Sequence, residues 1–292
     1  MRLHLVDGTY ELYRAHYAPR PGHASPEGQD LKATVGVVAS LLALLHDAGE
    51  DVTHLAVAFD NPIRSFRNDL YAHYKNDEGV PAELRAQFDT VEAAVRALGV
   101  AVWSMNEHEA DDGMASGAFK FRDAVDQVRI MTPDKDLGQC IRGTRVVQVD
   151  RRQMKVTDEE AFVARRGFPP TSMPDYLALT GDAADGFPGL PGFGEKGAGM
   201  LIGAYKHLEA IPASAAAWFV KPRGAMQLAA TLSEHRQEAL LYRKLATLVE
   251  DAPVAASLDE VRFAGVPRER FEGWCEEVGS KTLRAMPRRW DT

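Results

Sequence analysis

The sequence predicts an α/β protein in which a mostly parallel sheet is flanked by helices and is followed by a helical region. Over residues 1–150, short apolar runs alternate with helical patterns, which is typical of strand–helix–strand units. After residue 150 the strand pattern stops, and the mostly helical chain is interrupted by a Gly- and Pro-rich stretch at Gly181–Gly199. We therefore expect an α/β domain over residues 1–165 and a helical region over residues 166–292.

Short apolar runs bounded by polar or turn-forming residues predict the strands. These runs are Arg2–Val6, His54–Phe59, Val100–Ser104, Gln127–Met131 and Arg145–Val149. Apolar residues at helical spacing predict the helices between them. These helices are Leu31–Ala48, Glu83–Leu98 and Asp111–Phe121.

The composition is that of a globular protein. The 292 residues are 45% hydrophobic and 26% charged, which is too apolar for disorder and enough for a sizeable core. No apolar run approaches the ~18 residues of a membrane helix, and Asp7 interrupts the apolar start that a signal peptide needs. The two cysteines form no CxxC pair. We expect a cytoplasmic monomer that has no membrane partner.

Acidic residues recur where the predicted strands end. Because carboxyl ends of parallel strands meet at one edge of a sheet, these acids should crowd into one cleft and repel one another. Divalent cations would relieve the repulsion, and oxygen ligands favour Mg²⁺ or Mn²⁺ over zinc. The nine histidines show no metal-binding spacing. The acids are Asp7, Asp60, Glu109, Asp111, Asp112, Asp134 and Asp136, with Asp182 and Asp185 in the later Gly-rich stretch.

The formal net charge of −8 argues against a polyanionic partner, but nine carboxylates held by metal ions would leave a nearly neutral remainder. Each acidic pair also has a structural interpretation. Glu109 to Asp112 suits a helix N-terminus, Asp134-Lys-Asp136 is a common loop pattern, and Asp182 to Asp185 suits a helix cap. The acids considered together favour a metal site.

The segment Asn61–Pro81 is long for a connection between a strand and a helix. Its basic and aromatic residues are interleaved, a pattern that favours contact with a nucleic-acid strand. Arg64 and Arg67 are the candidate contacts. A solvated loop is the alternative interpretation.

Two motifs are misleading. The Asp7-Gly-Thr9 run is similar to a haloacid-dehalogenase phosphatase motif, but Leu5 occupies the position of the nucleophilic aspartate. The run Gly192-Phe-Gly194-Glu-Lys196-Gly satisfies GxGxxG without the preceding strand of a dinucleotide site. A hairpin between helices, whose backbone N–H groups and Lys196 bind a phosphate, is the better interpretation. A plain turn between helices is the alternative.

Together these residues resemble the bacterial 5′-nuclease family, which includes flap endonucleases and the 5′→3′ exonuclease domain of DNA polymerase I. The resembling stretches follow the family order and cover most of the chain. They are LVDGTYELYRA with Asp7, AFDNPIRSFRNDLYAHYK from Asp60 to Lys75, EADD from Glu109 to Asp112, TPDKDLGQ with Asp134 and Asp136, and ALTGDAADGFPGLPGFGEKGA with Asp182 and Asp185. No polymerase region follows, so we expect a stand-alone nuclease.

The resemblance implies a PIN-like α/β domain, a helix-three-turn-helix DNA-binding element and two or more divalent metal ions. It implies that Lys75 lies near the scissile phosphate and that Arg14 is a further candidate for phosphate contact. The hairpin around Gly192 and Gly194 can hold K⁺ beside a DNA phosphate in this family. The implied ligands are Asp7, Asp60, Glu109, Asp111 and Asp112 for the first metal, and Asp134, Asp136, Asp182 and Asp185 for the second, some through water.

The chain departs from the family at three places. Asn76-Asp77-Glu78 follows Lys75 where relatives carry another basic residue, which weakens phosphate steering by this segment. Gly186 replaces an Asn and Gly197 replaces a Thr or Ser, and neither change removes an expected ligand.

We therefore expect metal-dependent hydrolysis of DNA at 5′ ends, flaps, nicks or gaps. The alternatives are a haloacid-dehalogenase-like phosphatase and a catalytically inactive DNA-binding member of the same family. A nuclease assay with and without Mg²⁺ separates the three hypotheses.

Overall fold

The computed structural model describes residues 1–291, which form two compact units. The first unit contains residues 1–65, 77–132 and 250–292, and the second contains residues 66–76 and 133–249. Each unit is discontinuous because the chain leaves it and later returns. The sequence-based division at 165/166 separates two consecutive parts of the chain and stays a prediction.

The first unit is built on a parallel sheet. Its strands lie in the order β3-β2-β1-β4 and have few exposed side chains. Leu5 in the middle of the sheet is opposite Ala56 on one side and Ile130 on the other. The strands are β1 (Arg2–Asp7), β2 (His54–Asp60), β3 (Ala101–Met105) and β4 (Gln127–Met131). The predicted α/β class and these four strands are confirmed to within a residue.

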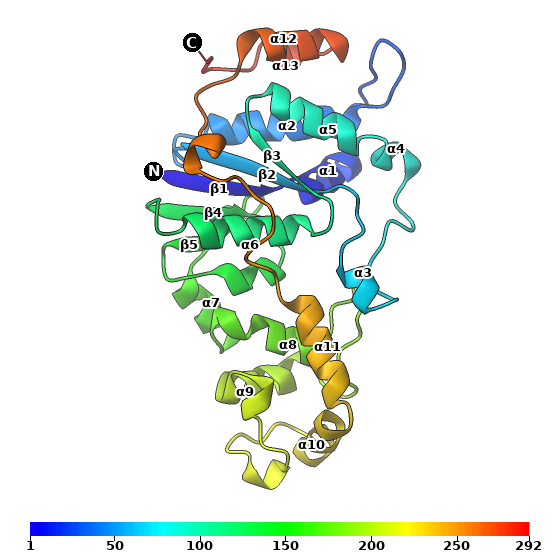
Figure 1. The fold of residues 1–292 in the computed structure, drawn as a ribbon, viewed down its shortest axis with the longest axis vertical. Helices are drawn as coiled ribbons and strands as arrows, with labels where there is room; N and C mark the ends of the chain where they lie inside the picture. Colours follow the sequence, from blue (N-terminus) through cyan, green and yellow to red (C-terminus); the bar gives the residue numbers. More distant parts are fainter. Residues whose placement is uncertain (292) are drawn as a thin grey trace. The chain divides into compact units, whose positions relative to one another are not determined.

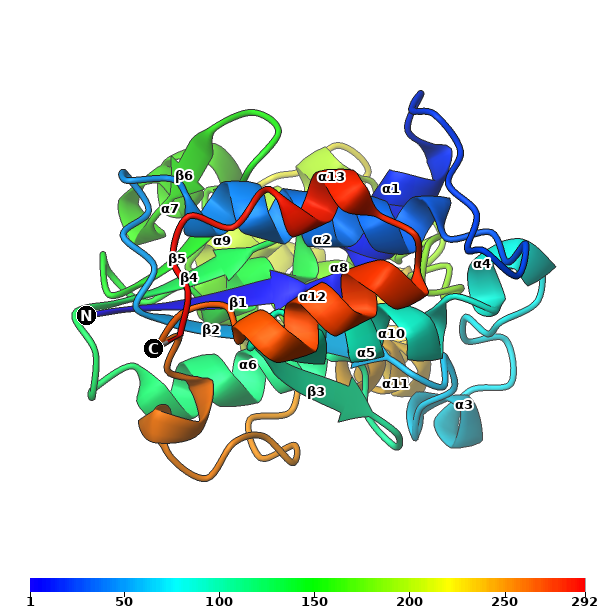
Figure 2. The same ribbon diagram turned by 90° about the horizontal axis from the view of Figure 1, so that it is seen from above.

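Helices cover both faces of this sheet (Figures 1 and 2). Helices α1, α2 and α5 lie on one face and α6 on the other, while α12 and α13 pack outside α5 and α2. Gly117 lets α6 approach the sheet, because a Cβ there would lie 2.5 Å from the Trp103 ring. The helices are α1 (Gly8–Tyr17), α2 (Lys32–Leu45), α5 (Phe88–Ala97), α6 (Ala110–Phe121), α12 (Arg268–Glu277) and α13 (Lys281–Arg284).

The predicted single helix Glu83–Leu98 is wrong, because the chain forms two helices, α4 (Ala82–Arg85) and α5. Gln87 between them turns its side chain inward and is fully buried. Its Oε1 accepts hydrogen bonds from the N–H and the hydroxyl of Thr34, both at 3.0 Å. A buried amide with partners on α2 is a long-range feature that helical spacing does not reveal.

The second unit is mainly helical, as predicted. Its hairpin of β5 and β6 is antiparallel, and α8 packs against α9 and α11 (Figure 1). Its elements are α3 (Arg67–Leu70), β5 (Val146–Asp150), β6 (Lys155–Thr157), α7 (Glu159–Arg166), α8 (Met173–Thr180), α9 (Glu195–Tyr205), α10 (Ala225–Glu234) and α11 (Arg236–Ala246). Its 3-10 turns are η1 (Asp136–Cys140), η2 (Pro170–Ser172), η3 (Leu208–Ala210) and η4 (Ala215–Ala217), and the first unit contains η5 (Leu258–Val261).

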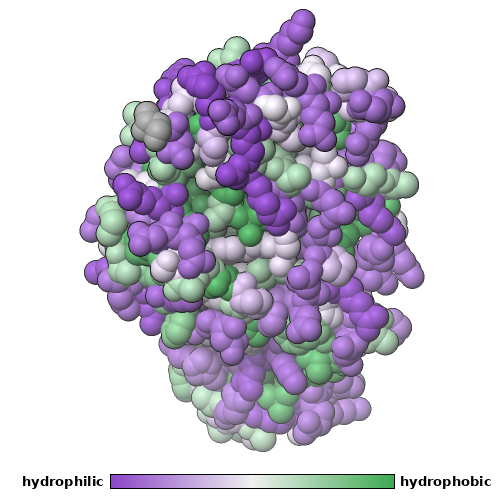
Figure 3. Space-filling model, turned by 45° about the horizontal axis from the view of Figure 1, so that its top comes forward, coloured by the Kyte–Doolittle hydropathy of each residue, from purple (hydrophilic) through white to green (hydrophobic). Residues whose placement is uncertain are grey.

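The face of the molecule in Figure 3 is mostly hydrophilic, with apolar residues interspersed. Over residues 1–291, no helix combines the length and the apolar character needed to cross a membrane.

Candidate metal centre and nucleic-acid interface

The first unit holds two of the predicted ligands at the ends of adjacent parallel strands. Asp7 ends β1, and its two carboxylate oxygens accept hydrogen bonds from the N–H of Tyr10 at 2.8 Å and the hydroxyl of Thr132 at 3.1 Å. Asp60 ends β2, and its Oδ1 accepts from the N–H of Ala110 at 2.8 Å. These bonds fix both carboxylates at the carboxyl edge of the sheet.

The acidic run after β3 caps helix α6. Glu109 and Asp112 are buried and form a capping box, in which each side chain accepts from the other residue's backbone N–H. Glu109 Oε1 also accepts from the hydroxyl of Ser65 at 2.8 Å. Asp111 is partly exposed on the first turn of α6. The carboxylates of Glu109 and Asp112 therefore cap helix α6, as one interpretation of the sequence expected. If they also hold a metal ion, they do so in addition to capping the helix.

The second unit brings three predicted ligands together. Asp136 begins η1, while Asp182 and Asp185 lie in the loop after α8. One carboxylate oxygen from each lies within 4.8 Å of the others, and all three side chains are buried. Oδ1 of Asp136 is buried without a hydrogen-bond partner. We call these three residues the acidic trio.

Burial and crowding disfavour negative charge on Asp136. Desolvation raises the pKa of Asp136 well above its usual range, and the nearby negative charges of Asp134, Asp185 and Asp182 raise it further. Asp134 is exposed, and its Oδ1 accepts from the N–H of Asp136 at 2.9 Å. Asp134 therefore supports the backbone that carries Asp136 and lies outside the group of three converging oxygens.

Two lysines partly neutralise the trio. Nζ of Lys75 lies 2.9 Å from Oδ1 of Asp185, and the ammonium of Lys135 pairs with Asp182. Lys75 is therefore held at the acidic trio, and its place near a scissile phosphate stays a prediction. The role of Lys135 was missed, although its place between Asp134 and Asp136 was the available signal.

The segment at residues 66–76 is packed within the second unit, which corrects the prediction for Arg67. Arg67 is 0% exposed, and its guanidinium donates to the carbonyl oxygens of Leu245 at 2.8 Å and Thr247 at 3.0 Å. A guanidinium used in this way is not a DNA contact. Tyr74 is also buried, and the Tyr71 ring packs edge-on against Tyr242. These aromatic residues support the core and do not form a platform for stacking bases.

The other two arginines singled out by sequence lie in the first unit. Arg14 on α1 pairs with the buried carboxylate of Glu11 and donates to the hydroxyl of Ser40 at 2.9 Å. These partners give Arg14 a structural role. Arg64 is exposed and remains a candidate DNA contact.

The predicted hairpin lies between α8 and α9. Gly192 has a φ of +80°, a conformation that glycine adopts without strain, and Gly194 is the N-cap of α9. A Cβ at Gly194 would meet no atom within 4 Å, so the backbone there is open to an approaching group. Lys196 is exposed on the first turn of α9. Free N–H groups and a lysine at a helix start suit a phosphate.

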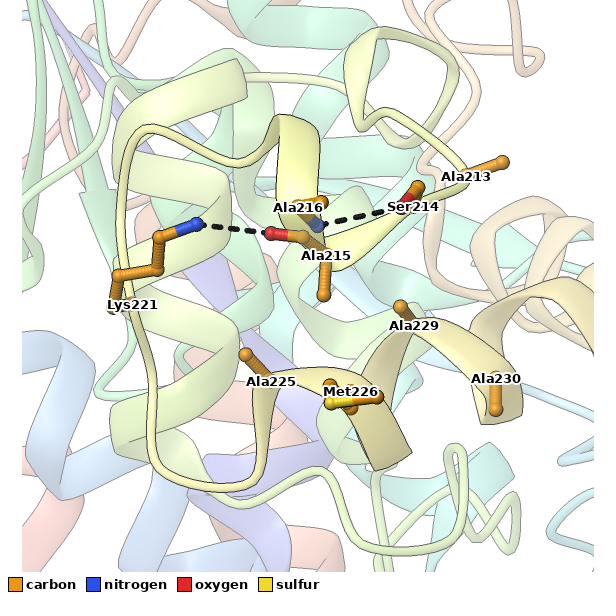
Figure 4. A pocket seen from close by; sticks show the side chains of 9 residues that line it. All are labelled: Ala213, Ser214, Ala215, Ala216, Lys221, Ala225, Met226, Ala229 and Ala230. Atoms are coloured by element: carbon orange, nitrogen blue, oxygen red, sulfur yellow. Dashed lines mark hydrogen bonds between the residues drawn. The ribbon is translucent and has the colours of Figure 1, made fainter.

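A hollow of about 560 Å³ lies between η4 and α10 in the second unit (Figure 4). Alanines dominate its lining, which includes no carboxylate and no histidine. Its lysine, Lys221, donates to the carbonyl oxygen of Ala215 at 3.0 Å. The hollow therefore lacks the carboxylate and imidazole groups that hold metal ions, and the acidic trio is the better candidate site.

The trio fits a divalent cation by the chemistry of its donors. All three ligands are carboxylate oxygens, which suit Mg²⁺ or Mn²⁺. The unpartnered Oδ1 of Asp136 is a buried acceptor that a cation would satisfy. Lys75 and Lys135 supply only part of the charge compensation in the structure.

Two family models match the chain consecutively. Residues 2–167 match the N-terminal resolvase-like domain of 5′-3′ exonucleases, and residues 168–269 match their C-terminal SAM fold. DNA polymerase I of Bacillus caldotenax is 32% identical over 97% of this chain and 32% of its own length. DNA polymerase I of Pseudomonas aeruginosa is 35% identical over 94% of this chain and 31% of its own length. The chain thus spans about a third of these curated relatives.

Solved structures share the fold. The T5 5′-exonuclease with bound divalent metal ions (zinc) has a TM-score of 0.65 at 15% identity, covering 95% of this chain and 100% of that one. The bacteriophage T5 flap endonuclease in complex with DNA and metal ions has a TM-score of 0.64 at 16% identity, covering 96% and 100%. The catalytic core of Rad2 with a DNA substrate has a TM-score of 0.58 at 14% identity, covering 95% and 88%.

Proposed function

This chain belongs to the 5′-3′ exonuclease family, and we propose that it hydrolyses phosphodiester bonds of DNA at 5′ ends, flaps, nicks or gaps. The observation that carries the proposal is the acidic trio with Lys75 held against it. Buried carboxylates that converge in this way are costly unless a cation compensates them. A metal-dependent nuclease uses such an arrangement.

The proposed ligands form one set in each unit. Asp136, Asp182 and Asp185 would hold one metal ion, and Asp134 would act on it through water. When bound, Mg²⁺ or Mn²⁺ supplies a Lewis acid for the phosphoryl oxygens and lowers the pKa of a bound water. The proposed set of the first unit is Asp7, Asp60, Glu109, Asp111 and Asp112.

Lys75 is the proposed catalytic residue of this chain. Its partly exposed ammonium, now 2.9 Å from Asp185, would donate to a phosphoryl oxygen as negative charge develops there. Arg14 remains a weaker candidate because Glu11 and Ser40 already engage its guanidinium. No covalent intermediate with the protein is needed.

The hairpin supports binding of duplex DNA away from the cut. Backbone N–H groups near Gly192 and Gly194, with Lys196, would contact one phosphate without reading the base sequence. In this proposal the hairpin is part of a helix-three-turn-helix DNA-binding element and holds a K⁺ ion beside the DNA phosphate. The protein acts as a monomer. Arg64 is its remaining candidate contact in the first unit.

The two alternatives have specific weaknesses. A haloacid-dehalogenase-like phosphatase needs a nucleophile where this chain has Leu5, which is apolar and fully buried. An inactive DNA-binding protein would gain nothing from a buried, unpartnered carboxylate oxygen at Asp136.

The test is cleavage of end-labelled flap, nicked and gapped duplexes with Mg²⁺, with Mn²⁺ and with excess EDTA. We expect cleavage near the 5′ end only when a divalent cation is present, and product mapping separates exonuclease from flap endonuclease activity. Release of inorganic phosphate from small esters alone would favour the phosphatase. Binding without any cleavage would favour the inactive protein, and full cleavage in excess EDTA would overturn the metal centre.

Replacing Lys196 by Ala is expected to weaken binding of duplex-containing DNA equally across sequences. The loss of one phosphate contact should reduce the salt slope of the binding constant by about 1. The rate of cleavage at saturating DNA should stay near that of the wild type. Affinity measured at several salt concentrations checks this, with Lys155→Ala, an exposed lysine on β6, as the matched control. An unchanged slope in folded Lys196→Ala protein would exclude the phosphate contact.

A further inference from the structure

Hydrogen bonds and an ion pair hold both the backbone and the side chain of Lys75. Its N–H donates to the carbonyl oxygen of Asp185 at 3.0 Å, and its ammonium lies 2.9 Å from the same residue's Oδ1. Its carbonyl oxygen accepts from Nδ2 of Asn68 at 2.9 Å. All three residues belong to the second unit. The side chain of Asn68 therefore holds the backbone from which the Lys75 ammonium reaches the acidic trio.

Asn68 lies on a short helix that is anchored to the rest of the second unit. This helix, α3, has only four residues and could not be stable alone. The buried guanidinium of Arg67 anchors α3 to the carbonyl oxygens of Leu245 and Thr247. Between Asn68 and Lys75, the backbone makes turn bonds and no further helix or strand. The Asn68 amide therefore links the anchored α3 directly to Lys75.

The chemistry of this link requires an amide or a similar donor. The Lys75 carbonyl is an acceptor, so its partner must present an N–H or O–H. An aspartate of the same shape would present only acceptors when ionised and would repel the carbonyl. The segment that follows Asn68 packs closely against the loop that carries Asp185. The backbone oxygen of His73 would lie 2.3 Å from a Cβ at Gly186, so only glycine fits there. Gly186 thus lets the two segments that carry Lys75 and Asp185 meet.

We propose that Asn68 is a positioning residue for the reaction and acts by aiming the Lys75 ammonium at the scissile phosphate. The inference rests on the proposed function, because it assigns Lys75 a catalytic role. Asn68 itself touches neither DNA nor metal in this proposal. A small displacement of a catalytic group is enough to slow a reaction strongly.

The test is a double-mutant cycle in steady-state and single-turnover cleavage of a flap substrate with saturating Mg²⁺. We expect Asn68→Ala and Asn68→Asp each to lower kcat about tenfold while KM and DNA affinity change little. In the Lys75→Ala background, Asn68→Ala should cause no further loss. Asn68→Gln, which keeps the amide, should recover part of the rate. Gln153→Ala, an exposed amide of the same unit, is the control.

A second readout needs no activity. In metal-free protein, Asn68→Ala should speed amide hydrogen exchange in a peptide covering residues 66–76 and leave a peptide from α8 unchanged. Equal rate losses in the Lys75 and Lys75→Ala backgrounds would show a merely structural role and overturn the proposal. Unchanged kcat and exchange in Asn68→Ala would overturn it as well. Absence of cleavage by the wild type would instead refute the proposed function, and the exchange result would still decide whether Asn68 holds the segment.

Discussion

Replacing Asp136 by Asn is expected to reduce the rate of DNA cleavage about 1,000-fold, equivalent to about 4 kcal/mol of transition-state stabilisation. Asp136 belongs to the acidic trio, and its unpartnered Oδ1 is the buried acceptor best suited to a cation. An amide keeps the shape and one oxygen but removes the negative charge. Single-turnover cleavage of a flap substrate over a range of Mg²⁺ concentrations measures the loss.

The same substitution should stabilise the metal-free protein. Desolvation by burial, and then the nearby negative charges of Asp134, Asp185 and Asp182, raise the pKa of Asp136 well above the unfolded value. A carboxyl whose folded pKa is raised destabilises the protein as pH rises through that range, and the penalty disappears on acidification. The melting temperature of Asp136→Asn should therefore exceed that of the wild type at neutral pH, by roughly 2–4 °C per kcal/mol relieved, and approach it in acid.

Melting temperatures of the wild type and of Asp136→Asn should also be compared with and without Mg²⁺ or Mn²⁺. Wild-type protein should gain stability from the ion by mass action, and Asp136→Asn should gain much less. Glu160→Gln, an exposed acid on α7, is the matched control and should behave as the wild type in every measurement. Normal cleavage by Asp136→Asn at limiting Mg²⁺ would remove Asp136 from the metal centre.

Local sequence patterns predict much of this fold for a physical reason. Strands β1, β2 and β4 are short apolar runs that are buried on both faces, and β3 at the sheet edge is partly buried, so the strands are encoded in consecutive residues. The acids that end or follow these strands lie at the carboxyl edge because parallel strands all end there. The clustering of Asp136, Asp182 and Asp185 follows from motif resemblance, since the loops that carry them are not encoded by periodicity.

Features missed by the sequence depend on contacts between distant segments. Arg67 and the surrounding tyrosines have the composition of a DNA-binding loop, yet Arg67 is buried by residues 245–247. The break at Gln87 depends on Thr34 of another helix. Lys135 pairs with Asp182, which is 47 residues away. Charge and aromatic content indicate which residues can bind a nucleic acid, but only the fold decides which of them remain exposed.

Replacing Lys75 by Ala is expected to lower the cleavage rate at saturating DNA about 100-fold, the usual cost of losing one donor to a developing oxyanion. DNA affinity should change little, because phosphate contacts elsewhere supply most of it. Lys155→Ala is again the matched control. Single-turnover rates and binding measured on the same flap substrate separate the two effects.

The Mg²⁺ dependence of Lys75→Ala decides how the lysine acts. In the structure its ammonium compensates Asp185, so removing it increases the negative charge at the trio and should tighten divalent-cation binding. If Lys75 donates to the substrate, saturating Mg²⁺ leaves the 100-fold defect in place, although half-maximal activity is reached at a lower concentration. If Lys75 is only a counter-ion for Asp185, saturating Mg²⁺ restores the rate and the catalytic role is refuted. The persistence of the defect under tighter metal binding is therefore the expected signature of a lysine that acts on the scissile phosphate.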